Sequence, residues 1–130
     1  MAFAWADYLR LAEELAQRPD DEAAHRSAVS RAYYAAFGRA CSHLTQQNIP
    51  VSQGDGSHKR VWESFSRLGR TYRSVQHNGD RLLRRRIVAD YWADYRNDQP
   101  ISPQDAASAV NTSKNILLWL DQLSGSSPSA

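Results

Sequence analysis

Apolar side chains recur at helical spacing along most of the chain, and no stretch alternates apolar and polar residues as a strand would. A first helix is predicted from about Phe3 to Gln17, closed by Pro19. Its apolar stripe consists of Trp5, Tyr8, Leu9, Leu11, Ala12 and Leu15. Asp20 or Asp21 can cap a second helix that reaches about Gln47. The predicted core face of this second helix is Ala28, Val29, Ala32, Tyr33, Ala36, Ala40 and Leu44.

Residues that interrupt helices divide the middle of the chain. Residues 48–56 contain a proline and two glycines, so we expect a loop there. Ser57 is expected to cap a third helix from His58 to about Leu68, because serine is a favoured N-cap residue. Gly69 would end this helix.

A fourth helix is predicted to begin near Asp80, because the triplet Asn78-Gly79-Asp80 favours a turn. It is expected to run to about Tyr95, with Pro100 beyond its end, and its core line recurs every four residues at Leu83, Ile87, Tyr91 and Tyr95. Ser102 followed by Pro103 predicts the start of a last helix that reaches about Leu123.

These elements predict one all-α domain. A length of 130 residues suits a single core and is too short for two. We expect an up-and-down bundle of four to five helices over residues 1–123, followed by a disordered tail at residues 124–130.

Composition narrows the classes of protein that remain. No run approaches the roughly 18 apolar residues of a membrane span, and the N-terminus alternates charges instead of placing a basic stretch before an apolar one. We therefore expect a soluble, unexported protein without a membrane partner. Cys41 is the only cysteine, and a buried, inert thiol suits a reducing cytoplasm. The four histidines lack zinc-site spacing, so neither a metal nor another cofactor is predicted.

Positive charge is concentrated in one segment. Residues 58–86 carry nine basic and two acidic side chains, whereas the segments before and after it each have an acidic excess. Clustered Arg and Lys favour a polyanionic partner, because they neutralise phosphates and release their counterions. The candidate nucleic-acid-binding residues are Lys59, Arg60, Arg81, Arg84 and Arg85. The alternative is an ordinary solvated helix face.

Three segments occur in an order that resembles a known family. They are SRAYYAAF at residues 30–37, SHKRVWESF at residues 57–65 and RRRIVADY at residues 84–91, followed by the Ser-Pro start of the last helix. The set resembles the HEPN family, the higher eukaryotes and prokaryotes nucleotide-binding domains, and in particular its small stand-alone prokaryotic members. The resemblance covers nearly the whole chain to about residue 123. It implies a helical bundle, a homodimer, and a toxin–antitoxin or phage-defence context, often beside a minimal nucleotidyltransferase.

The resemblance also implies candidate catalytic residues. Many HEPN proteins are metal-independent ribonucleases whose signature is an Arg, four to six intervening residues and a His, paired across the dimer. Here Arg86 matches the arginine, but Asp90 stands where the histidine is expected. A carboxylate is a weak base at neutral pH and lies one helical turn from Arg86, where the two side chains can pair. The nuclease motif is therefore altered, and a structural Arg–Asp pair is the competing interpretation.

Other histidines offer alternatives for proton transfer. His58 follows Ser57 at a predicted helix start, beside Lys59 and Arg60, where backbone amides favour an anion. It is the third candidate catalytic residue, and it could converge with Arg86 if the third and fourth helices pack together. Arg70 and His77 also have the family's spacing, although glycines surround that stretch. His25 and His43 are interpreted as ordinary polar positions on the second helix.

Three functions remain after these observations. The first is a dimeric HEPN-like protein that binds RNA or a nucleotidyltransferase partner and whose nuclease centre is altered or lost. The second is an active metal-independent ribonuclease toxin that uses Arg86 together with His58 or His77. The third is a structural adaptor whose arginines bind an acidic protein face.

Overall fold

The computed structural model describes residues 3–51, 54, 56–91 and 100–125, and these residues form five α-helices and no strand. The helices are α1 (Trp5–Ala16), α2 (Glu22–Gln46), α3 (Ser57–Ser64), α4 (Arg73–Tyr91) and α5 (Pro103–Gly125). Two short 3-10 helices, η1 (Phe65–Leu68) and η2 (Arg70–Tyr72), join α3 to α4. The prediction of an all-α bundle is confirmed.

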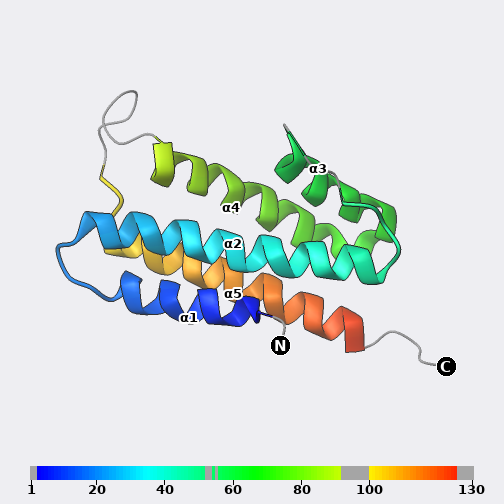
Figure 1. The fold of residues 1–130 in the computed structure, drawn as a ribbon, viewed down its shortest axis with the longest axis horizontal. Coiled ribbons are helices and arrows are strands. Elements are labelled where there is room, and N and C mark those ends of the chain that lie inside the picture. Colours follow the sequence, from blue (N-terminus) through cyan, green and yellow to red (C-terminus); the bar gives the residue numbers. More distant parts are fainter. Residues whose placement is uncertain (1–2, 52–53, 55, 92–99, 126–130) are drawn as a thin grey trace.

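Helix α2 lies at the centre of the bundle. It packs against α1, α4 and α5, while the short α3 covers the second half of α2 and the first half of α4 (Figure 1). Its predicted core face is correct, because all seven of those residues are buried. The small alanines on this face allow the neighbouring helices to approach closely. The largest fully buried side chains come from several elements and include Trp62, Tyr33, Phe65, Leu44 and Leu82.

Polar caps fix two helix starts as the sequence predicted. The Asp21 carboxylate accepts a hydrogen bond from the Ala24 backbone amide at 3.0 Å, and α2 begins one residue after Asp21. At the start of α5 the Ser102 hydroxyl accepts from the Asp105 amide, and the Asp105 carboxylate accepts from the Ser102 amide. This reciprocal pair resembles a capping box. The prediction of Ser57 as a cap is wrong, because Gly56 holds the N-cap position at φ 76° and Ser57 is already helical.

The predicted break at residues 78–80 does not exist, because α4 runs through it without interruption. Gly79 is buried where the Trp62 ring lies against the α4 backbone, and a Cβ at this position would meet that ring at 2.1 Å. The glycine therefore permits a close helix contact instead of a turn. The true break is at Gly69, whose φ of 99° separates η1 from η2. Helix α3 itself ends earlier, at Ser64, so the prediction that it reaches about Leu68 is wrong, although the 3-10 helix η1 continues to Leu68 before Gly69.

The ends of α4 and α5 also differ from prediction. The described part of α4 ends at Tyr91, and Tyr95 lies outside the described residues. Tyr91 is 67% exposed, so its placement on the core line is wrong. Each four-residue step advances about 40° around a helix, and two steps from Leu83 carry Tyr91 off the core face. Helix α5 includes Ser124 and Gly125, which were predicted to belong to the tail, whereas residues 126–130 lie outside the described range.

Within the part of the chain that the structure describes, no helix combines the length and the apolar character needed to cross a lipid bilayer.

Candidate functional site

Arg86 lies on the side of α4 that faces α2 and is 8% exposed. Its guanidinium carbon lies 5.5 Å from the ring centroid of Tyr33, 5.4 Å from that of Tyr34 and 5.8 Å from that of Tyr91. These distances are within the range of cation–π attraction, which strengthens when the cation is shielded from water. We call Arg86, these three tyrosines, His58 and Asp90 the Arg86 cluster.

Asp90 is the ionic partner of Arg86. Its Oδ2 lies 3.6 Å from Arg86 Nη1, one helical turn away, and the Ser30 hydroxyl donates a hydrogen bond to the same oxygen at 3.2 Å. The prediction that these two side chains pair on one helix face is confirmed. The Arg86 Nε atom is buried and has no hydrogen-bond acceptor among the described residues. The guanidinium thus keeps unused donor capacity despite its ion pair.

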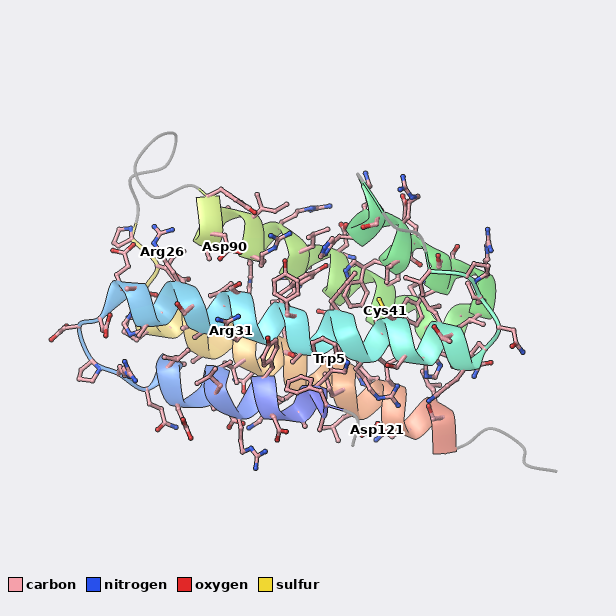
Figure 2. The ribbon with its side chains drawn as sticks, viewed as in Figure 1. Trp5, Arg26, Arg31, Cys41, Asp90 and Asp121 are labelled. Atoms are coloured by element: carbon pink, nitrogen blue, oxygen red, sulfur yellow. The ribbon has the colours of Figure 1, made fainter. Side chains whose placement is uncertain are left out.

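Arg26 fixes the end of α4 that carries Asp90. From α2, its Nη1 donates to the backbone carbonyls of Val88 at 3.2 Å and Ala89 at 3.0 Å, in the last described turn of α4. Figure 2 shows Arg26 near the end of α4 that carries Asp90. Its Nε donates to Glu22 at 2.9 Å. A cation near a helix C-terminus interacts favourably with the helix dipole. Arg26 therefore holds the turn of α4 that presents Asp90 to Arg86.

His58 belongs to the same cluster and joins it through residues of α2. Its ring stacks on Phe37 with centroids 4.1 Å apart and planes 13° apart. Its Nδ1 lies 2.7 Å from the Tyr33 hydroxyl, which also accepts a hydrogen bond from the Trp62 indole N–H at 3.1 Å. Burial lowers the pKa of His58, and the nearby Arg86 charge lowers it further. His58 is therefore neutral at pH 7 and held in place by an aromatic wall.

Tyr33 connects the parts of the cluster but is not a ready proton donor. It is fully buried, and burial raises the pKa of its hydroxyl well above the ordinary range of a tyrosine. An indole N–H can only donate, so the Tyr33 oxygen accepts from Trp62 and its own proton is available for His58 Nδ1. The hydroxyl thus orients the imidazole.

The candidate basic residues divide between two sides of α4. Arg81 and Arg84 are exposed, and Arg73 shares their side of the helix because it is two to three turns earlier. Lys59 is exposed on α3 and lines, with Arg73 and His77, a surface cavity of about 350 Å³. We call Lys59, Arg73, Arg81 and Arg84 the outer basic row. Arg84 also pairs with Asp80 across one turn of α4.

The remaining candidates lie elsewhere. Arg85 donates to the Ser108 hydroxyl at 3.0 Å, so it joins α4 to α5 instead of extending the outer basic row. Arg60 is exposed on α3. His77 is exposed on α4, on the opposite side from the buried Arg86, so the structure does not bring it to the Arg86 cluster.

Two histidines predicted to be ordinary polar positions are buried and hydrogen-bonded. His25 Nε2 lies 2.6 Å from the Arg18 carbonyl oxygen. His43 lies between the Tyr72 hydroxyl, 2.7 Å from Nε2, and the Ser124 hydroxyl, 3.1 Å from Nδ1. Burial lowers the pKa of His43, and Arg39 adds to this effect. Sequence periodicity could have flagged His43, which lies seven residues after the buried Ala36 and one before Leu44.

Sequence reasoning also missed the aromatic wall around His58. Tyr33 and Phe37 are one turn apart on α2, and His58 and Trp62 are one turn apart on α3, so the spacing that would have shown it was present. What was missing was the knowledge that α2 and α3 face each other.

The described residues contain no group of three or more His, Cys, Asp or Glu side chains placed to hold a metal ion. The single thiol, Cys41, is half-buried, and burial raises its pKa to about 11, which makes it a poor nucleophile at neutral pH. Nucleophilic chemistry through this thiol is therefore disfavoured.

Comparison of the chain with protein-family models, with curated proteins and with solved structures found no match.

Proposed function

We propose that this chain is a HEPN-like helical protein that binds RNA and whose nuclease centre is altered. The proposal rests on one contrast. Arg86 pairs with Asp90 among three tyrosines, whereas the cations of the outer basic row are exposed. The row offers phosphates four cations from two helices, with the carboxylates of Glu63 and Asp80 as near neighbours. Exposed Arg and Lys attract a polyanion without the cost of removing them from a buried ion pair.

The nuclease centre is proposed to be altered because the Arg86 cluster lacks a strong base. Asp90 is committed to Arg86 and Ser30. His58 Nδ1 is engaged by Tyr33, so only Nε2 is available to a ligand. In the tautomer in which Nδ1 accepts the tyrosine proton, neutral His58 carries its own proton on Nε2, where it can donate but not accept. Such a group binds a phosphate oxygen but does not deprotonate a 2′-hydroxyl.

A binding measurement tests this proposal. Fluorescence anisotropy of a labelled single-stranded RNA should show binding that weakens with KCl concentration. The double variant Arg81→Gln/Arg84→Gln should weaken binding and flatten the salt dependence by about 0.7 in the logarithmic slope for each phosphate that the variant no longer neutralises. Arg10→Gln, an exposed arginine on α1, is the matched control and should have little effect. Absence of RNA binding at low salt, with tight binding of an acidic protein, would instead indicate a structural adaptor.

A second candidate function is a metal-independent ribonuclease of the toxin class. The observation that favours it is the proximity of His58 to Arg86, whose charge lowers the pKa of the imidazole. Imidazole can transfer protons at neutral pH and guanidinium can stabilise charge on phosphoryl oxygens. Cleavage of RNA in EDTA that falls by orders of magnitude in Arg86→Ala and His58→Ala, but not in the control His77→Ala, would support this function and overturn the binding proposal.

We propose a homodimer in the cytoplasm as the working form, with a minimal nucleotidyltransferase or another defence protein as a further partner. The support is the same ordered set of three segments at residues 30–37, 57–65 and 84–91. Light scattering of the purified protein tests the dimer. The reading frame adjacent to the gene tests the partner, because a small nucleotidyltransferase encoded there would favour the toxin–antitoxin context.

A further inference from the structure

A second hollow lies away from the Arg86 cluster, where α1 begins. Helix α1 starts at Trp5, whereas α2 and α5 both continue past this point, so their shared groove extends beyond the cover that α1 provides (Figure 1). The cavity there has a volume of about 430 Å³. It is lined by Phe3, Ala4, Trp5, Ala6, Arg39, Ser42, Gln46, Leu117 and Asp121. This volume is within the range of small-molecule sites.

The end wall of this groove is aromatic and rigid. The Trp5 ring lies so close to α2 that a Cβ on Gly38 would meet it at 2.1 Å. Phe3 packs edge-on against Trp5, with ring centroids 5.1 Å apart and planes 87° apart, and is itself 52% exposed. Exposed aromatic rings held in place by their neighbours offer a surface on which a planar ring can stack with little loss of side-chain entropy.

The floor of the groove is polar but electrically balanced. Arg39 Nη2 lies 3.1 Å from Asp121 Oδ1, so one positive and one negative group are already paired, with Trp5 and Asp121 on the same side of the bundle (Figure 2). Ser42 and Gln46, one turn apart on α2, add a hydroxyl and a carboxamide without charge.

From this combination we propose that the groove is a binding site for a planar, uncharged heteroaromatic ring of the nucleobase class. The ring would stack on the exposed Phe3 ring, which lies nearly perpendicular to Trp5, and place its hydrogen-bonding edge against Gln46 and Ser42. A carboxamide can donate and accept at once, as glutamine does when it binds the N6 and N7 edge of adenine. The ring can come from a free nucleoside or from an unpaired base of an RNA strand. The site is independent of the RNA-binding proposal, because it shares no residue with the outer basic row or the Arg86 cluster.

Binding is tested by following the indole N–H resonance of Trp5, assigned through its loss in Trp5→Phe, during titration with adenosine. Saturable shifts at Trp5 and at the Gln46 side-chain amide are expected. Gln46→Leu should raise the Kd about tenfold, since a bidentate amide contact contributes about 1–3 kcal/mol. Gln47→Leu is the matched control, because Gln47 is exposed and does not line the groove, and it should leave the Kd unchanged.

Two further probes, a short oligoadenylate and indole, test whether the ligand is a free nucleoside or an RNA base and whether its polar edge contributes to binding. Shifts with adenosine alone identify a free nucleoside as sufficient, whereas shifts seen only with a short single-stranded oligoadenylate assign the site to an RNA base; both results support the proposal. Indole binding as tightly as adenosine would overturn it, because the polar edge would then contribute nothing. No saturable shift with either nucleotide probe would also overturn it, even if the outer basic row bound RNA.

Discussion

The two sides of α4 carry arginines in opposite situations. On the inner side, Arg86 is 8% exposed, packs among three tyrosines and pairs with Asp90. On the outer side, the side chain of Arg84 is 74% exposed and pairs with Asp80, one turn earlier. Two residues of the same type, two positions apart, thus differ in what they can do. The inner arginine organises the fold, and the outer one is available to a partner.

We expect the largest effect in the free energy of unfolding, when Arg86 and Arg84 are each replaced with alanine. Arg86→Ala removes the ring contacts and leaves Asp90 without its cation, so we expect the free energy of unfolding to fall by about 2–3 kcal/mol. Arg84→Ala should change it by less than about 0.5 kcal/mol, because its ion pair is exposed. Urea denaturation followed by circular dichroism measures both values. Equal losses would show that the two sides of α4 do not differ as described.

Gly79 tests the close packing on α4, because the sign of the stability change on replacing it with alanine depends on that packing. Replacing a glycine inside an exposed helix with alanine normally stabilises it by about 1 kcal/mol. Gly79→Ala should instead destabilise the protein by about 1–3 kcal/mol, because the new Cβ would overlap the Trp62 ring. The neighbouring Asn78→Ala, which meets no such ring, is the control in the same urea experiment. A Gly79→Ala protein that is more stable than the wild type would contradict the close contact with Trp62 and would again favour the turn predicted from residues 78–80.

Tyr33 and Tyr34 both contact Arg86 on the inner side of α4, but we expect their hydroxyl groups to contribute differently to stability. Tyr33→Phe leaves the buried Trp62 indole N–H without its acceptor, which should cost about 1–3 kcal/mol. Tyr34→Phe removes a hydroxyl that bonds to no described residue while keeping the ring beside Arg86, so stability should hardly change. If the two variants are equally stable, the hydroxyl of Tyr33 does not support Trp62.

Proton uptake by the buried His43 and the partly buried His58 gives the smallest expected effect. The pKa values of His43 and His58 are lowered in the folded protein, mainly by burial and then by Arg39 and Arg86 respectively. The unfolded chain therefore binds more protons below the ordinary histidine pKa of about 6.5, and stability should fall as the pH drops from 7.5 through this value. His43 faces the Tyr72 and Ser124 hydroxyls, and His58 faces Tyr33, so no carboxylate among the described residues bonds to either ring to offset the cost.

Urea midpoints measured between pH 7.5 and 5 test this dependence. His43→Gln and His58→Gln should each flatten the pH profile of the free energy of unfolding. A profile that becomes more stable toward pH 5, or variants that follow the wild-type slope, would contradict the assignment.

The sequence predicted the elements whose signals are local. Asp21 and Ser102 have side chains that cap a neighbouring amide, and both starts are correct. Arg86 and Asp90 lie on one helix, so their pairing also follows from spacing alone. The errors at Gly79 and Tyr33 arise where a distant residue decides the outcome, whereas those at Ser57 and Tyr91 concern local helix geometry. Gly79 is helical because Trp62 packs on it, and the role of Tyr33 depends on His58 and Trp62, which are about 25 to 29 residues away in the chain.

Arg26 has a consequence for engineering this protein. Together with Glu22, it ties both the last carbonyls of α4 and the Ile101 amide ahead of α5 to the first turns of α2. The last described turn of α4 and the residue before Ser102 are therefore held at the same place on α2. The arrangement of Arg86, Asp90 and Arg26 thus rests on contacts between the helices themselves, and sequence changes made away from these contacts should leave it in place.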